Sequence, residues 1–209
     1  MVLGAGKGDR MGELTEYCPK VLLPYKGKPI LAYVLDNLPG LVSEAIIIVG
    51  YKAKAVCQFL TAYSDYFPIT EVYQEQLTGD STALLCAKHL LKDEDLFAVI
   101  NGDVIIPKHD IETMLKIGLP LIAVSPYVIP LGVVTSVGNI VKTIREKPTI
   151  NVNAGFFVLP STIFPFLHSR DYISKALSYA VETKSIRVVK YQVSEWLHFS
   201  RQEDLENHS

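Results

Sequence analysis

In the first half of the chain, continuous apolar runs bounded by turn residues alternate with segments of helical spacing. The runs 45–49 and 96–100 predict buried parallel strands, because a strand covered on both faces carries uninterrupted apolar residues. Apolar residues at helical spacing predict helices over 30–38, 52–63 and 81–91. This alternation indicates an α/β fold.

The second half has many strand-like runs with few helices between them, which predicts a mixed sheet. Strands are expected at 119–124, 132–135, 140–145, 153–159 and 186–190, and helices at 160–167, at 172–181 and near Glu203. At the other end of the chain, Met1-Val2-Leu3 has the character of the last part of a buried strand. The first strand is therefore expected to be unusually short.

The bulk composition narrows the class of protein. With 209 residues, 49% of them hydrophobic, the chain can bury one large core, so a single domain over 1–209 is expected. A net charge of -2 with scattered Lys and Arg argues against a nucleic-acid partner. No apolar run reaches the roughly 20 residues that span a bilayer, and no signal segment is visible, which predicts a cytoplasmic protein without a membrane partner. Three cysteines without CxxC spacing are expected to be free thiols.

A glycine-rich segment, GAGKGDR at 4–10, follows the short first strand. Its backbone amides can approach an anionic ligand without obstruction from side chains. The segment fails the dinucleotide fingerprint, which needs a glycine where Asp9 stands, and it fails the spacing of the P-loop. It predicts a phosphate loop of another kind, and the alternative is an ordinary tight turn.

The longer segment 3–31, LGAGKGDRMGELTEYCPKVLLPYKGKPIL, resembles the signature of the sugar-1-phosphate nucleotidylyltransferases without a gap. The resemblance implies that Arg10 and Lys20 contact the triphosphate as catalytic residues. An Arg fork and a Lys point charge suit phosphoryl transfer, which depends on positioning and charge neutralisation. Asp9 stands where the family has Thr or Ser. The residues that the resemblance assigns to the nucleotide in this segment are Leu3, Ala5, Gly6 and Gly8.

The segment 74–83, QEQLTGDSTA, resembles the family's base-binding motif, with Gln74 and Gly79 at matching positions. A Gln side chain can read the imide edge of uracil or thymine, so Gln74 favours a pyrimidine nucleotide. Asp80 replaces the usual Thr. The alternative is a polar turn that caps the next helix through Asp80 or Ser81.

Asp103 ends the apolar run in Asn101-Gly102-Asp103, at the sheet edge where open α/β folds place ligands. Mg²⁺ prefers hard oxygen ligands and keeps waters and substrate phosphates, so one or two carboxylates are sufficient. An ordinary turn residue is the alternative. The resemblance makes Asp103 a catalytic residue and the first metal ligand.

Three later motifs follow the family's order and concern the acceptor. They are LGVV at 131–134, REKP at 145–148 and NAGFFVL at 153–159. The resemblance implies that Gly132 presents its backbone to the sugar, that Glu146 and Asn153 bind hydroxyls, and that Lys147 holds the sugar phosphate.

Near the C-terminus, His198 stands where the family's WxDxGTPEDL-like segment has an Asp. Imidazole is a poorer ligand for Mg²⁺ than for zinc or manganese. Our hypothesis is that His198 lies near the metal, directly or through water. The alternative is a partly exposed histidine in a terminal strand.

The resemblance covers nearly the whole chain and implies a Rossmann-like three-layer α/β/α nucleotide-diphospho-sugar transferase fold, related to GT-A, with a mixed, mainly parallel sheet. No segment is left for an added acyltransferase domain. The expected reaction is NTP plus sugar 1-phosphate to NDP-sugar plus pyrophosphate, with Mg²⁺ as cofactor. Two alternatives stay open, namely cytidylyl-type transfer to a non-sugar phosphate and a catalytically weak nucleotide-sugar-binding regulatory protein. A homo-oligomer is expected, as for many members of the family.

Overall fold

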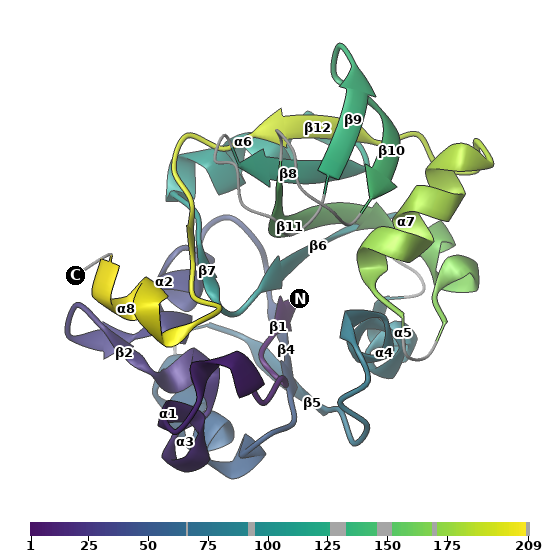
Figure 1. Cartoon of the computed structure of the whole chain (residues 1–209). Coiled ribbons are helices and arrows are strands. Elements are labelled where there is room, and N and C mark those ends of the chain that lie inside the picture. The colour runs from purple at the N-terminus through teal and green to yellow at the C-terminus, as the bar shows by residue number, and fades with distance from the viewer. Residues whose placement is uncertain (66, 92–94, 126–132, 146–151, 169–170, 208–209) are drawn as a thin grey trace.

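A mixed sheet of nine strands forms the centre of the molecule (Figure 1). The computed structural model describes residues 1–65, 67–91, 95–125, 133–145, 152–168 and 171–207. The strands follow the spatial order β5 (Ile69–Tyr73), β4 (Ala45–Val49), β1 (Val2–Leu3), β6 (Leu96–Asn101), β11 (Val152–Pro160), β8 (Leu121–Ser125), β12 (Val189–Gln192), β10 (Ile140–Arg145) and β9 (Val133–Val137).

The two halves of the sheet are joined by one reversed strand. From β5 through β4 and β1 to β6 all neighbours are parallel, as expected for strands linked by crossover helices. Strand β11 then runs antiparallel to both β6 and β8, whereas β8 and β12 are again parallel. The predicted mixed sheet is confirmed, as is the expectation of an unusually short first strand, which has two residues.

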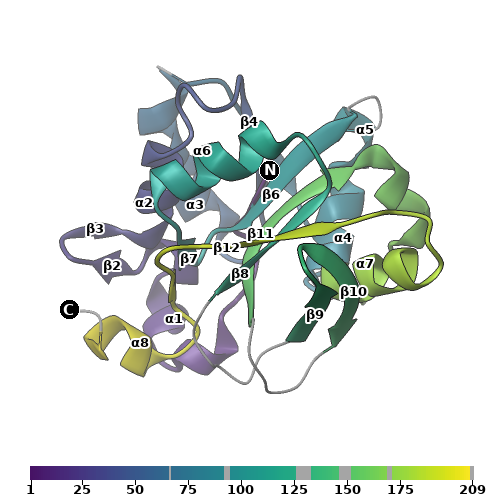
Figure 2. The same cartoon turned by 90° about the horizontal axis from the view of Figure 1, so that it is seen from above.

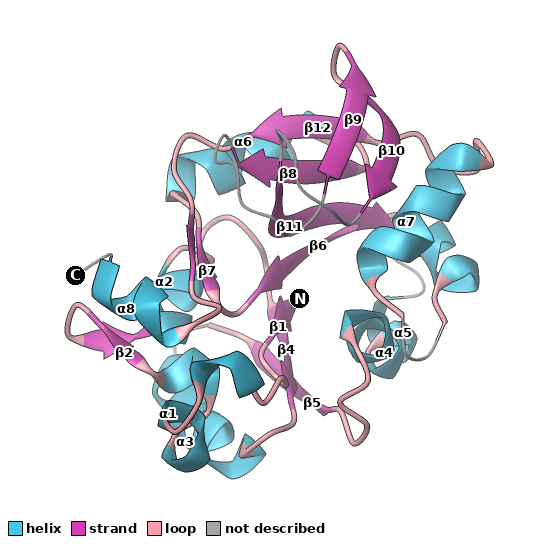
Figure 3. Ribbon diagram, in the orientation of Figure 1, coloured by secondary structure: helices cyan, strands magenta, loops and turns pink. Residues whose placement is uncertain are grey.

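Helices cover both faces of this sheet (Figures 1, 2 and 3). One apolar cluster contains Leu35 of α2 (Ile30–Asp36), Leu60 of α3 (Ala53–Ser64) and Met114 of α6 (Lys108–Ile117). A second cluster holds the helices of the opposite face, which are α4 (Asp80–Cys86), α5 (Lys88–Leu91), the 3-10 helix η3 (Ser161–Phe166) and α7 (Ile173–Glu182). The fold therefore has three layers. In the described part of the chain, no helix is long and apolar enough to cross a bilayer.

A third, small core joins the two ends of the chain beside the sheet. Phe199 is fully buried there against Met11 and Tyr25. The elements around it are short: η1 (Asp9–Met11), α1 (Leu14–Tyr17), η2 (Lys20–Leu22), β2 (Pro24–Tyr25), β3 (Lys28–Pro29), β7 (Val104–Ile105), β13 (Leu197–His198) and α8 (Gln202–Asn207).

Three expected elements differ from the structure. The helix expected at 81–91 begins at Asp80 and is interrupted at Ala87, where the backbone leaves the helical region. The segment 160–167 forms a 3-10 helix that contains Pro165, which lacks the amide hydrogen for an α-helical bond. The last main strand begins at Val189, where pairing with β8 starts, and not at residue 186. The free state expected for the three cysteines is confirmed.

Candidate functional site

The site begins where β1 and β6 end side by side. Strands β4 and β5 continue the sheet on one side of β1 and β6 lies on the other, so the strand order reverses here and leaves a crevice. The amide of Gly102 donates to the carbonyl of Leu3 at 2.8 Å. A Cβ atom at Gly102 would lie 2.9 Å from that oxygen, so only glycine allows the two chain segments to approach this closely.

Two adjoining cavities open at this edge, with volumes of about 420 Å³ and about 1030 Å³. Arg10, Asp80, Asn101 and Asp103 line both of them. The smaller cavity is also lined by every residue assigned to the nucleotide from the sequence: Leu3, Ala5, Gly6, Gly8, Gln74 and Gly79. The larger cavity is also lined by Asn153 and His198. The structure therefore brings the described site residues together around Asp103.

Lys20, on the wall of the smaller cavity, forms an ion pair with Asp103, which lines both cavities. The Lys20 Nζ to Asp103 Oδ2 distance is 2.5 Å, and Lys20 is only 8% exposed. Gly8 has a φ of +74°, and a Cβ atom there would lie 2.9 Å from Lys20 Cδ, so the glycine makes room for the lysine stem. Burial acts to raise the pKa of Asp103, but the charge of Lys20, joined by that of His198 at the acidic pH where its imidazole is protonated, outweighs burial and holds this pKa below its ordinary value. Asp103 is therefore ionised at neutral pH.

His198 reaches Asp103 through strand pairing. In the β13–β7 pair, His198 lies opposite Val104, and the amide of Phe199 donates to the carbonyl of Asp103 at 3.0 Å. The His198 Nε2 to Asp103 Oδ2 distance is 3.8 Å, and the ring stacks on Trp196 with centroids 5.4 Å apart. Burial lowers the pKa of His198 in spite of Asp103, so a neutral imidazole faces the carboxylate.

Gln74 is buried in the wall of the smaller cavity and organises its own loop. Its Nε2 donates to the carbonyls of Gln76 at 2.9 Å and Gly79 at 3.0 Å. The donor half of the amide is thus used within the loop in this structure, and direct reading of a base by Gln74 stays a prediction. The N-cap residue of α4 is Gly79, which has no side chain to cap the helix, and the carboxylate of Asp80 accepts the amide of Ile173 at the start of another helix.

Comparison with known proteins fits this geometry. The family model for the MobA-like NTP transferase domain matches residues 1–121, which include the glycine-rich loop, Lys20 and Asp103. The chain belongs to the MobA-like NTP transferase domain family.

Two curated relatives of this NTP transferase domain are named bifunctional protein GlmU. The protein from Methanocaldococcus jannaschii is 30% identical over 205 residues, which are 91% of this chain and 48% of the relative. The protein from Methanococcus maripaludis strain C5 is 31% identical over 176 residues, 81% of this chain and 42% of the relative. The chain thus spans less than half the length of these relatives.

Solved structures show the same fold at low sequence identity. A UDP-glucose pyrophosphorylase in complex with UDP-glucose superposes with a TM-score of 0.85 at 20% identity, covering 99% of this chain and 95% of the other. A putative glucose-1-phosphate thymidylyltransferase from Bacillus anthracis gives a TM-score of 0.88 at 19% identity, covering 99% and 92%. The three-layer Rossmann-like fold expected from the sequence is confirmed.

Two side chains of the NTP transferase domain, Asp103 and His198, are candidate ligands for a metal ion. Asp103 supplies a carboxylate and His198 a neutral imidazole, both on the wall of the larger cavity. The described residues contain no group of three or more His, Cys, Asp or Glu side chains that could enclose an ion. The carboxylate of Asp103 fits a cation such as Mg²⁺ that retains waters and takes its other oxygens from substrate phosphates, whereas the imidazole of His198 is a poorer ligand for this ion. Magnesium itself stays a prediction.

Asp9, the departure in the glycine-rich loop, has a local counter-ion. Its Oδ1 lies 3.1 Å from Lys7 Nζ, and its side chain is 77% exposed. The next residue, Arg10, is exposed and lines both cavities. The loop therefore offers two positive side chains against one negative one.

On the acceptor side, Asn153 is placed by a bulge in β11. The register of β11 against β8 shifts between Asn153 and Phe157, and Asn153 Oδ1 accepts the amide of Gly155 at 2.9 Å. Gly155 has a φ of +74°, and a Cβ atom there would lie 2.8 Å from Asn101 Nδ2. Three further residues assigned to the acceptor lie outside the described residues: Gly132, Glu146 and Lys147.

One wall of the larger cavity was not identified from the sequence. Helix α7 contributes several polar side chains to it: Ser174, Lys175, Ser178 and Glu182. Their spacing of three and four residues marks one helix face, opposite buried residues such as Leu177. The same pattern is typical of a solvated helix face. The sequence therefore reveals that these side chains share one face of α7, but not that this face lines the larger cavity.

Proposed function

We propose that this protein is a nucleotidylyltransferase that transfers a nucleoside monophosphate from an NTP to a sugar 1-phosphate and releases pyrophosphate. The observation that carries the proposal is the meeting of two cavities at Arg10 and Asp103, with Lys20 paired to Asp103 from the wall of the smaller cavity. A transferase needs two substrates side by side with their reacting phosphates at the border, and positive charge at that border.

In the proposed reaction, a phosphate oxygen of the acceptor attacks the α-phosphorus of the NTP. A new bond forms between them, the bond from the α-phosphorus to the bridging oxygen breaks, and its electron pair leaves with pyrophosphate. The acceptor oxygen is already ionised at neutral pH, so no general base is required.

The residues at the border have distinct tasks in this reaction. Backbone amides of the glycine-rich loop hold the triphosphate, and Arg10 and Lys20 neutralise charge on its oxygens. Asp103, together with His198, would hold the divalent cation, which when bound supplies further positive charge to the triphosphate. Asn153 orients the acceptor through its side-chain amide.

The nature of both substrates is part of the proposal. The names of the fold neighbours, UDP-glucose pyrophosphorylase and glucose-1-phosphate thymidylyltransferase, support a pyrimidine nucleotide and a hexose 1-phosphate. Two other neighbours, with TM-scores of 0.82, are a CTP:phosphocholine cytidylyltransferase from Streptococcus pneumoniae and an inositol-1-phosphate CTP transferase from T. maritima. Acceptors of these two kinds therefore belong in the test.

The test is pyrophosphate release with Mg²⁺ across a panel of NTPs, sugar 1-phosphates, phosphocholine and inositol phosphate. We expect release that needs one NTP and one sugar 1-phosphate and that Asp103→Ala abolishes. The matched control is Asp36→Ala, which removes an exposed, ion-paired carboxylate that lines neither cavity. Turnover of phosphocholine or inositol phosphate alone would move the assignment to a non-sugar acceptor. No release from any pair, with NTP still bound, would replace the enzyme by a nucleotide-binding regulatory protein.

A further inference from the structure

The nucleotide loop and the helix that walls the larger cavity meet at Asp80. Asp80 lines both cavities, and its Oδ1 accepts a hydrogen bond of 2.6 Å from the amide of Ile173, the first residue of α7. Tyr172, the residue at the N-cap of α7, provides no side-chain cap. Because the first amides of a helix have no partner within the helix, the Asp80 carboxylate acts as a cap supplied from another element, with a charge that suits this end of the helix.

Backbone contacts tighten the same junction. The amide of Ser81 donates to the carbonyl of Asp171 at 3.3 Å. Gly79 has a φ of +137°, and a Cβ atom there would lie 2.6 Å from the same oxygen. Three consecutive residues of the loop, 79–81, are thus in contact with the start of α7, and a side chain at residue 79 would force them apart.

Each side of the junction has stabilising contacts of its own. On the nucleotide side, the two hydrogen bonds of Gln74 close the loop, and the hydroxyl groups of Thr78 and Thr82 lie 2.9 Å apart. Behind the junction, α4 and α7 share one apolar cluster that includes Ala83, Leu84, Ile173, Ala176 and Leu177. A displacement of the start of α7 is therefore expected to move the polar side chains of this helix that line the larger cavity.

We propose that Asp80 is a positioning residue that sets the distance between the nucleotide loop and the α7 wall of the acceptor cavity. The inference rests on the proposed function, since it assigns the smaller cavity to the nucleotide and the larger one to the acceptor. Transfer requires the acceptor oxygen in line with the α-phosphorus, and small errors in that alignment reduce the rate strongly. A carboxylate at residue 80, where the family has Thr, reaches the amide of Ile173 and locks both walls together.

The test compares Asp80→Ala with Asp80→Asn, using the NTP and acceptor that the pyrophosphate panel identifies. Asp80→Ala removes the cap, and we expect the acceptor KM to rise about fivefold, while the KM of the NTP changes less than about twofold. Asp80→Asn keeps an oxygen that accepts the Ile173 amide, so it should restore the acceptor KM. Hydrogen exchange of the amides at 173–176 should become about fivefold faster in Asp80→Ala and stay near the wild-type rate in Asp80→Asn.

Ala180→Gly is the control for destabilisation of α7 alone, because Ala180 is buried in the helix and lines neither cavity. It should lower the melting temperature and leave the acceptor KM unchanged. The inference is overturned if Asp80→Ala leaves the acceptor KM unchanged, if it raises both KM values equally, or if exchange at Ile173 does not change. Failure of the proposed function is a different result, because wild-type protein would then release no pyrophosphate with any substrate pair.

Discussion

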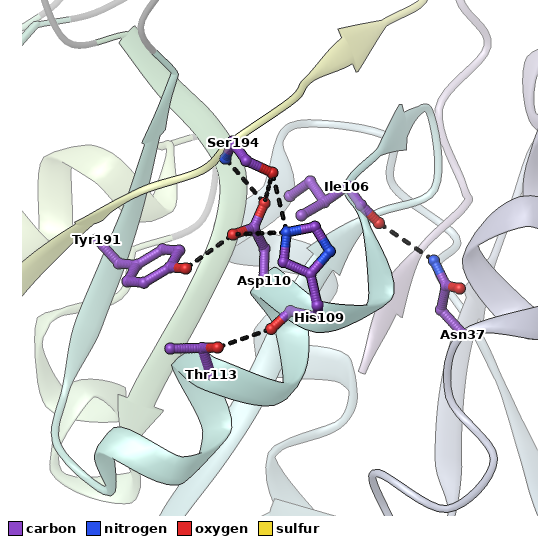
Figure 4. A network of polar contacts seen from close by, with 7 residues as sticks. All are labelled: Asn37, Ile106, His109, Asp110, Thr113, Tyr191 and Ser194. Carbon is purple, nitrogen blue, oxygen red and sulfur yellow. Dashed lines mark hydrogen bonds and ion pairs between the residues drawn. The ribbon is translucent and has the colours of Figure 1, made fainter.

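Asp103 and Asp110 lie seven positions apart on one segment of the chain, yet their surroundings differ in kind. Asp110, in the first turn of α6, is 2% exposed and lines neither cavity. Its oxygens accept hydrogen bonds from Tyr191 Oη at 2.7 Å, from the Ser194 amide at 2.8 Å and from Ser194 Oγ at 2.7 Å (Figure 4). Asp103 instead has an ammonium and an imidazole as neighbours and borders both cavities.

The comparison shows that burial alone does not identify a functional carboxylate. Burial acts to raise the pKa of both groups, and partners hold both pKa values below the ordinary range. Fixed neutral donors saturate Asp110, so it anchors the chain that leads from β12 toward Trp196 and His198. Asp103 has a charged partner at an open cavity, where a ligand has room to approach both the carboxylate and the ammonium group.

The largest expected effect is that of Asp103→Asn on turnover. We expect a loss of at least about 1000-fold, close to 4 kcal/mol of transition-state stabilisation, because the substitution removes the charge that pairs with Lys20 and that would hold the proposed cation. The free energy of unfolding should change by only about 1 kcal/mol, since Lys20 borders an open cavity. Steady-state kinetics and urea unfolding measure the two quantities. Asp36→Asn is the control and should keep its turnover. Wild-type turnover in Asp103→Asn would contradict the role of Asp103.

Asp110→Ala should lower stability strongly and leave substrate binding nearly unchanged, the opposite of what is expected for Asp103→Asn. Its removal leaves the hydroxyl of Tyr191 and two donors of Ser194 without their acceptor, so the free energy of unfolding should fall by about 3 kcal/mol. The KM values should stay within about twofold of wild type, because Asp110 touches neither cavity. His109→Ala is the matched control, since His109 is the exposed neighbour in the same network and its loss should cost little. Unchanged stability in Asp110→Ala would remove the distinction between the two aspartates.

Gly8→Ala should lower both the turnover and the free energy of unfolding moderately. The φ of +74° at Gly8 strains any other residue by about 1 kcal/mol, and the new methyl group would push against Lys20 Cδ. We expect about a tenfold loss of turnover, because Lys20 is displaced from the border of the cavities. Gly12→Ala has a similar positive φ of +59° with open space around it, so it should lose stability without losing turnover. Equal turnover in the two variants would show that Lys20 tolerates the displacement.

The smallest expected effect is the pH dependence of the contribution that Asp110 makes to the free energy of unfolding. The pKa of Asp110 is lower in the folded protein than in the unfolded chain, where it is about 3.9. Its contribution to stability is therefore complete above about pH 5 and is lost as the pH falls through the folded-state pKa. The difference in unfolding free energy between wild type and Asp110→Asn, measured in a His109→Gln background, should shrink below about pH 4. A constant difference down to pH 3 would mean that this carboxyl group does not titrate as expected.

Much of the site was predictable because its residues follow buried strands directly. Asp103 and the glycine-rich loop come at the ends of β6 and β1, and parallel strands end at the same edge of a sheet. The role of Gln74 was less predictable, because whether its amide faces a base or its own loop depends on the path of that loop. The ends of helices were also less predictable, as the interruption at Ala87 illustrates.

Apolar periodicity and local motifs were sufficient to specify the α/β alternation, the short first strand and the place of Asp103, because burial on a helix face or within a strand is a local property of the chain. Only the tertiary structure brings His198 beside Asp103 and Asp80 against Ile173, 93 positions away. These contacts depend on the strand order and on close backbone approaches at glycines such as Gly79 and Gly102. Strand order is set by packing between distant segments of the chain, so the local pattern of residues does not predict it.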